Sequence, residues 1–240
     1  MNKPYGAQGE IQGFPFKDLH ETFYNQGGIE IEVTEGILRV GVSDPDNLEE
    51  AKERTQLYLS AWAARHNIRL SVIFNHVWRP NQQGGQDHAL TFEEQVKVRD
   101  RVQVQVTTHQ IQVPLSYAVV TEEMRDTASF TNDETMVQKA GRHPALKSAL
   151  LYYSQEVVDD ERPLYGVYKA IEAMIGSLSG RDKRNDLANM AGQPRSYVDD
   201  VMQTTQVRRH HSTTGTRRLS DEECRERAKI LIDAYANSLP

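Results

Sequence analysis

Residues 163–179 read PLYGVYKAIEAMIGSLS, and they carry the clearest helical pattern in the C-terminal half of the chain. Its apolar residues recur at intervals of three and four positions, which is typical of one buried face of an α-helix. The apolar positions are Leu164, Val167, Tyr168, Ile171, Met174, Ile175 and Leu178. Pro163 suits the first helical turn, where its missing N–H needs no partner, and we expect Gly180 to end the helix.

Two further amphipathic helices flank this one. The first begins at Pro144, and the second begins at Ser220, where Ser220 and Glu223 have the spacing of a capping box. A shorter helix is expected over 196–207. No amphipathic helix can bury its own apolar stripe, so we expect these helices to pack together. The expected buried positions of the flanking helices are Leu146, Leu150, Tyr153, Val157, Cys224, Ala228, Leu231 and Tyr235.

The first half of the chain shows the two-residue alternation of β-strands. A hairpin is predicted over 28–42, with its turn at Thr34-Glu35-Gly36. A helix over 47–66, capped by Asp46, is expected to cross one side of a central strand at 69–78. Two more strands are predicted near 102–106 and 111–115, residues 79–90 are expected to form a loop, and residues 1–25 are expected to form an aperiodic arm.

These patterns predict an α+β fold with two domains. Residues 1–125 would form a mixed or antiparallel sheet domain with one crossing helix and an N-terminal arm. Residues 126–240 would form an all-α helical bundle domain. A length of 240 residues exceeds that of most single domains, which agrees with this division.

The composition limits the class of protein. The chain is 38% hydrophobic and 26% charged, which is typical of a globular protein. It contains no apolar run long enough to span a bilayer and no visible signal peptide, so we expect a cytoplasmic protein of bacterial type without membrane contact. A single cysteine excludes an internal disulfide framework and a cysteine-rich zinc site.

Residues 181–218 differ in charge from the rest of the chain. They hold eight Lys or Arg and four Asp, a net charge of +4 in a chain whose total is −6. The acidic total argues against general coating of nucleic acid, whereas a local basic patch suits an anion or nucleic-acid site. The candidate binding residues are Arg181, Lys183, Arg184, Arg195, Arg217 and Arg218.

Arg208, Arg209, His210 and His211 follow one another at the expected end of the 196–207 helix. Cations at a helix C-terminus complement the helix dipole, and this structural role or ordinary solvated surface accounts for them. The alternatives are an anion or nucleic-acid site and a catalytic site in which these four residues act together.

Established catalytic motifs are absent from the sequence. It contains no GxxxxGK[ST], GxGxxG, GxSxG or HExxH pattern, and its histidines are scattered. We therefore predict no cofactor and no metal, with a zinc site assembled from scattered ligands as the alternative. His76, alternating with apolar residues, is expected to be a hydrogen-bonded core or edge residue, and Cys224 a packed thiol.

The C-terminal half resembles the HEPN-like helical domains found in many bacterial proteins. The resemblance lies in ERPLYGVYKAIEAM (161–174), SYVDDVMQTTQVRRHH (196–211) and LSDEECRERAKILIDAY (219–235). It implies a helical bundle that forms homodimers, in a stress or defence system. Active members of the family resemble metal-independent ribonucleases, in which Arg holds the phosphate and His transfers protons.

The leading hypothesis is therefore a non-enzymatic module that binds RNA or protein. The resemblance implies an alternative, a metal-independent endoribonuclease that uses Arg208 or Arg209 and His210 or His211. In this chain the arginines adjoin the histidines directly, whereas active family members separate them by several residues. This departure favours binding or assembly over cleavage. A third hypothesis is small-molecule sensing by the 79–90 loop.

Overall fold

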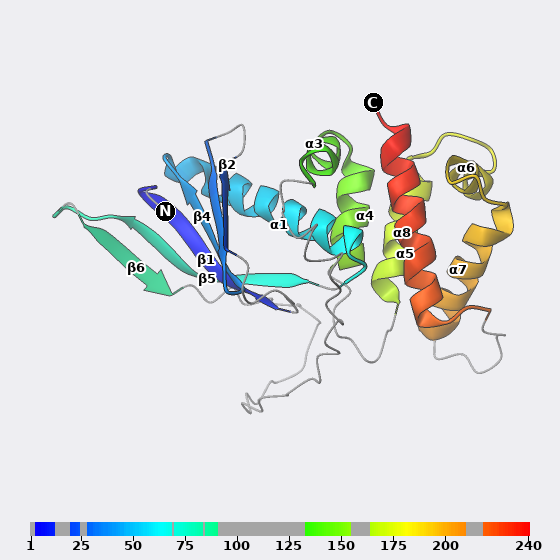
Figure 1. The fold of residues 1–240 in the computed structure, drawn as a ribbon. Helices are drawn as coiled ribbons and strands as arrows, with labels where there is room; N and C mark the ends of the chain where they lie inside the picture. Colours follow the sequence, from blue (N-terminus) through cyan, green and yellow to red (C-terminus); the bar gives the residue numbers. More distant parts are fainter. Residues whose placement is uncertain are drawn as a thin grey trace, which may run out of the picture.

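The computed structural model describes residues 3–12, 20–24, 28–68, 70–83, 85–90, 133–154, 164–209 and 218–240. The side chains of residues 20–24, 71, 90 and 207–209 are not described. Figure 1 shows a β-sheet at one end of the molecule, a group of helices at the other, and the long helix α1 running from one to the other. The fold class is α+β, as predicted.

The sheet has six strands in the order β2-β3-β4-β1-β5-β6, and every neighbouring pair is antiparallel. The strands are β1 (Tyr5–Gln12), β2 (His20–Tyr24), β3 (Glu30–Thr34), β4 (Ile37–Val42), β5 (Ser71–Pro80) and β6 (Gln86–Leu90). The predicted hairpin is confirmed by β3 and β4, whose turn contains Glu35 and Gly36 at positive φ. The predicted central strand is β5, which pairs on both sides.

The expected aperiodic arm is wrong for most of its length, because residues 5–12 form β1 in the middle of the sheet. Glycines conceal this strand in the sequence. A Cβ atom on Gly6 would lie 2.0 Å from the Trp78 ring, and one on Gly9 would lie 2.5 Å from the Ile73 carbonyl oxygen. The strand therefore needs glycines where β-formers would usually indicate it.

The loop expected at 79–90 is also partly wrong, since residues 86–90 form β6. The turn before β6 is organised by Asn81. Its side-chain oxygen accepts hydrogen bonds from the backbone N–H groups of Gln83 (3.0 Å) and Gly85 (2.8 Å), and its own N–H donates to the Gly85 carbonyl (2.9 Å). The strands predicted at 102–106 and 111–115 lie outside the described residues.

Helix α1 (Leu48–Arg65) confirms the helix predicted over 47–66. Its entry differs from the expected one, because the N-cap of α1 is Asn47, whose side chain makes no capping hydrogen bond. Asp44 instead caps the preceding 3-10 turn η1 (Pro45–Asn47) by accepting a hydrogen bond from the Asp46 N–H (3.1 Å). All residues from 57 to 64 are buried. A helix that is buried all round must be covered by neighbours on every side.

The C-terminal half is helical, as predicted. Its described helices are α3 (Glu134–Arg142), α4 (Pro144–Ser154), α5 (Tyr165–Ser177), α6 (Lys183–Met190), α7 (Arg195–Arg209) and α8 (Asp221–Ser238). Helices α4, α5 and α8 pack together, and the capping box is present: Ser220 Oγ accepts from the Glu223 N–H (3.1 Å), and Glu223 Oε2 accepts from the Ser220 N–H (2.6 Å). Lys139 Nζ donates to the Ala236 and Leu239 carbonyls at the other end of α8.

Gly180 does not end α5, since the helix stops at Ser177 and Leu178 is already extended. Gly180 serves a close approach instead. A Cβ atom there would lie 1.7 Å from the Asp186 carboxylate, in the first turn of α6. Helix α6 was not predicted, because its eight residues (KRNDLANM) contain few apolar positions.

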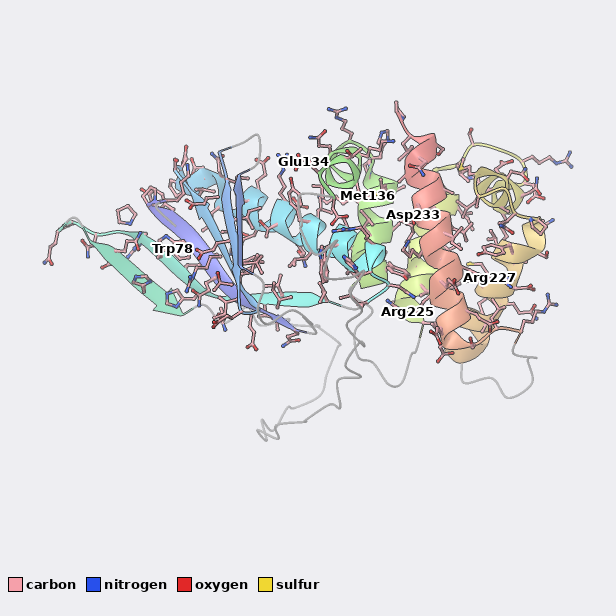
Figure 2. The ribbon with its side chains drawn as sticks, viewed as in Figure 1. Trp78, Glu134, Met136, Arg225, Arg227 and Asp233 are labelled. Carbon is pink, nitrogen blue, oxygen red and sulfur yellow. The ribbon has the colours of Figure 1, made fainter. Side chains whose placement is uncertain are left out.

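Helix α1 joins the sheet to the helices. It packs on β1 and β4 and also on α3 and α4. Polar side chains also join α1 to α3 and α4. Arg65 forms an ion pair with buried Asp133 (2.9 Å), and Tyr58 and Ser60 form hydrogen bonds with Glu134 and Ser154 (2.8 Å for the serine pair). Figure 2 shows Glu134 and Met136 on α3, the helix that lies above α1 in this view. The buried residues of both halves belong to one continuous cluster, while the expected boundary near residue 125 lies outside the described residues.

Among the described residues, no helix combines the length and the apolar character that a membrane crossing requires.

Tyr153 tests the junction between α1, α4 and α8. Its hydroxyl contacts Asn67 Oδ1 (2.5 Å) and the Arg225 carbonyl (3.1 Å), and its ring lies under the Arg225 guanidinium (4.7 Å). Tyr153→Phe should lower the free energy of unfolding by about 1–2 kcal/mol, because a buried hydrogen-bonding group is lost. The matched control is the neighbouring Tyr152→Phe, whose side chain is 44% exposed and should change little. Denaturant unfolding measures both, and equal effects would contradict the assigned role.

A candidate anion site on the helical half

The described parts of the basic segment form the helices α6 and α7 and the approach to α8. Asp182 caps α6 by accepting a hydrogen bond from the Asn185 N–H (3.3 Å). Helix α7 begins at Arg195 and carries Asp199 and Asp200 one turn later. Arg218 lies two residues before Ser220, the cap of α8. The segment therefore brings acidic side chains beside three of its basic ones, Arg184, Arg195 and Arg218.

Asp199 and Asp182 hold the first group of arginines, between α6 and α7. Arg184 Nη1 donates to Asp199 Oδ1 (2.9 Å), and Arg195 Nε lies 3.2 Å from Asp199 Oδ2. Arg195 also reaches Asp182 Oδ2 (3.1 Å) through Nη1. We call these four residues the α6–α7 cluster. Its two positive charges face two negative ones, so it has no net charge.

Asp200 holds the second group, between α7 and α8. Arg218 Nη1 donates to Asp200 Oδ1 (2.6 Å), and Arg227 Nη1 lies 3.7 Å from Asp200 Oδ2. The Arg227 guanidinium also stacks over the Tyr197 ring, with 4.5 Å between its carbon and the ring centroid. Figure 2 shows Arg227 on α8, on the side that faces α7. We call these four residues the α7–α8 cluster.

The two clusters stabilise helix packing modestly. The paired side chains are between 23% and 52% exposed, so water and salt screen their attraction. Exposed ion pairs of this kind contribute about 0–1 kcal/mol each. Their combined effect is to orient α7 between α6 and α8.

Tyr197 is the titratable group that this arrangement perturbs. Partial burial raises the pKa of its phenol above the usual value of 10.0, because the phenolate would lose hydration. The positive charge of Arg227 opposes this rise, and the negative charge of Glu226 adds to it. The tyrosine therefore stays protonated at neutral pH and serves as an aromatic platform for Arg227.

The structure separates the candidate binding residues. Arg184 and Arg195 meet at Asp199 in the α6–α7 cluster, while Arg218 pairs with Asp200 in the α7–α8 cluster. For Arg181 and Lys183 the structure records no ion pair within the described part of the chain. Arg208 and Arg209 lie in the last turn of α7, and their side chains, like residues His210, His211 and Arg217, are outside the description.

Sequence reasoning missed the acidic partners and Arg227. The Arg195–Asp199 pair was readable from its i,i+4 spacing on one helix. The pairs Arg184–Asp199 and Arg218–Asp200 join different helices, so spacing along the chain does not reveal them.

Charge balance extends over the described surface of these helices. Residues 181–206 and 218–240 together carry eight Lys or Arg and nine Asp or Glu, a net side-chain charge of −1. A surface that neutralises phosphates needs an excess of cations. This part of the helical half has none.

No family model, no curated protein and no solved structure matches this chain.

Asp200 tests the α7–α8 cluster. Asp200→Asn should lower the free energy of unfolding by about 1 kcal/mol or less, because Arg218 and Arg227 lose their shared carboxylate. The difference from wild type should shrink in high salt, which already screens the pairs. Glu226→Gln on α8 is the control, since Glu226 is exposed and has no recorded ion pair. Denaturant unfolding at low and high salt provides the measurement.

Tyr197 predicts a pH dependence. Its folded-state pKa is raised, so above about pH 10 the unfolded chain releases the phenolic proton first. The stability of the wild type should therefore fall, relative to Tyr197→Phe, as the pH rises past that value. Below about pH 9 the difference between the two proteins should stay constant. Denaturant unfolding of both proteins across this pH range measures the difference in their free energies of unfolding. A difference that does not change with pH would contradict the prediction.

Proposed function

We propose that this protein is a non-enzymatic module that binds another protein through its helical half. The observation that carries the proposal is the pairing of Arg184, Arg195 and Arg218 with aspartates of α6 and α7. Arginines that pair with carboxylates are less available to a phosphate, because the phosphate would compete with Asp199 or Asp200 for them. The basic segment then serves helix packing, and a protein partner is favoured over RNA.

The outer face of α8 supports a protein partner. Ile230 is 39% exposed there, next to the exposed Glu226 and to Asp233, which pairs with Lys229 (2.9 Å). Figure 2 shows Asp233 on the part of α8 that faces the viewer. An apolar side chain between charges of both signs suits the core and rim of a protein interface. A second copy of this chain is the first partner to test.

The resemblance to HEPN-like domains enters here as part of the proposal. We infer that it extends to the helical architecture, to homodimer formation and to a bacterial stress or defence setting. Cleavage of RNA by Arg208 or Arg209 with His210 or His211 is the competing function. The arginines directly adjoin the histidines in this chain, whereas active family members separate them, and this difference argues against cleavage.

RNA provides the first test. Wild type incubated with labelled RNA and EDTA should neither cleave it nor retain it at physiological salt. The double variant Asp199→Asn/Asp200→Asn should gain salt-dependent retention, because Arg184 and Arg218 lose their carboxylates and Arg195 keeps only Asp182. The matched control is Asp233→Asn, which removes a carboxylate outside both clusters.

Two outcomes would contradict the proposal. Cleavage that disappears in His210→Ala/His211→Ala would establish the ribonuclease. Retention of RNA by the wild type, falling steeply with salt, would establish RNA binding.

Self-association provides the second test. Light scattering after size exclusion should give twice the chain mass, and Ile230→Glu should return it to one chain. Met190→Glu is a suitable control, because Met190 is similarly exposed (37%) but lies on α6. A monomeric wild type would exclude the second copy as the partner.

A further inference from the structure

The sheet carries a pair of histidines that the proposed function does not use. His76 on β5 and His88 on β6 bring Nε2 and Nδ1 to 2.8 Å from each other, with ring centroids 5.1 Å apart. His76 is half-buried and His88 is exposed. We propose that this pair is a binding site for a borderline divalent cation, Zn²⁺, Ni²⁺ or Cu²⁺.

The register of the two strands builds the pair. His88 lies opposite Trp78, and His76 lies two residues from Trp78 on the same face of β5. Cross-strand diagonal neighbours on one face are close enough for large side chains to touch. This face is the one turned away from α1, since Trp78 covers Gly6 while the adjacent Ala7 points into the core.

The distance suits a metal. Imidazole nitrogens bind zinc at about 2.0–2.1 Å, so two of them at 90–109° around one ion lie about 2.9–3.4 Å apart. The observed separation of 2.8 Å is close to this range, and both rings would turn so that their lone pairs point at a common ion instead of along the N···N line. The hydrogen-bonded proton would move to the other ring nitrogen of its own histidine, so that both rings stay neutral and His76 Nε2 and His88 Nδ1 each offer a lone pair to the ion.

The strands hold the pair in place before any ion arrives. Asn81 fixes the turn between β5 and β6 through three hydrogen bonds and also donates to Asp87 Oδ1 (3.3 Å). Trp78 Nε1 donates a hydrogen bond to the Lys3 carbonyl (3.2 Å), which attaches β5 to the residues just before β1. Because the hydrogen-bonded strands already fix the two histidines, their side chains lose little conformational entropy when they bind an ion.

The ligand set defines the class of ion. Imidazole nitrogen is a good ligand for zinc, nickel and copper, and copper binds most tightly in this series. The described residues contain no group of three potential protein ligands, so water would complete the coordination. Such a site exchanges its ion readily and leaves positions open to an outside ligand. The inference is independent of the proposed protein partner and differs from the sequence-based expectation of no metal.

Titration calorimetry of the full chain, without a polyhistidine tag, tests the site with ZnCl₂, NiCl₂ and CuCl₂. We expect saturable binding of one ion per chain. His76→Gln and His88→Gln should each weaken it by about tenfold or more, because the second ligand is lost. Controls are His143→Gln on the helical half and the double variant His210→Gln/His211→Gln, which should bind as the wild type does.

Thermal melting gives a second readout. Excess metal should raise the melting temperature of the wild type and of both controls, since the ion binds the folded chain, and EDTA should reverse the rise. His88 is exposed on an edge strand, so His88→Gln should fold normally and show no rise. Unchanged affinity in the His76 and His88 variants, loss of binding in either control, or no saturable binding to the wild type would overturn the proposal.

Discussion

The burial of α1 on all sides is the constraint on which the rest of the structure depends. Residues 57 to 64 are all buried, and Ser60, Ala61, Ala63 and Ala64 keep this part of the helix narrow. The sheet can therefore cover one side closely while α3 and α4 cover the other. The same helix supplies Tyr58, Ser60 and Arg65, which place α3 and α4 through polar contacts.

The sequence predicts those elements whose own residues contain their pattern. The periodicity of 163–179 and the Ser220 capping box predict α5 and α8, and alternation predicts β3, β4 and β5. It fails for β1, whose glycines are required by Trp78 and by the β5 backbone rather than by the strand itself. The sequence also does not show that α1 is buried all round, because Ser60, Ala61, Ala63 and Ala64 are too weakly apolar to mark a second buried face.

For the candidate sites, too, the sequence predicts what lies within one element and not what depends on tertiary packing. Sequence shows that charge accumulates between residues 181 and 218, and the i,i+4 spacing shows Arg195 beside Asp199. The contacts made by Arg184, Arg218 and Arg227 depend on how α6, α7 and α8 pack, and that information is tertiary. The pairing of His76 with His88 depends on the register of β6, a strand that the sequence did not predict.

The placement of the two tryptophans has a consequence for following denaturation. Trp62 lies fully buried in α1, Trp78 lies on the sheet, and the chain contains no others. Intrinsic fluorescence thus reports on the sheet and on α1, whereas far-ultraviolet dichroism is dominated by the helices of the other half. Because both halves share α1, the two spectroscopic transitions should coincide as one cooperative event.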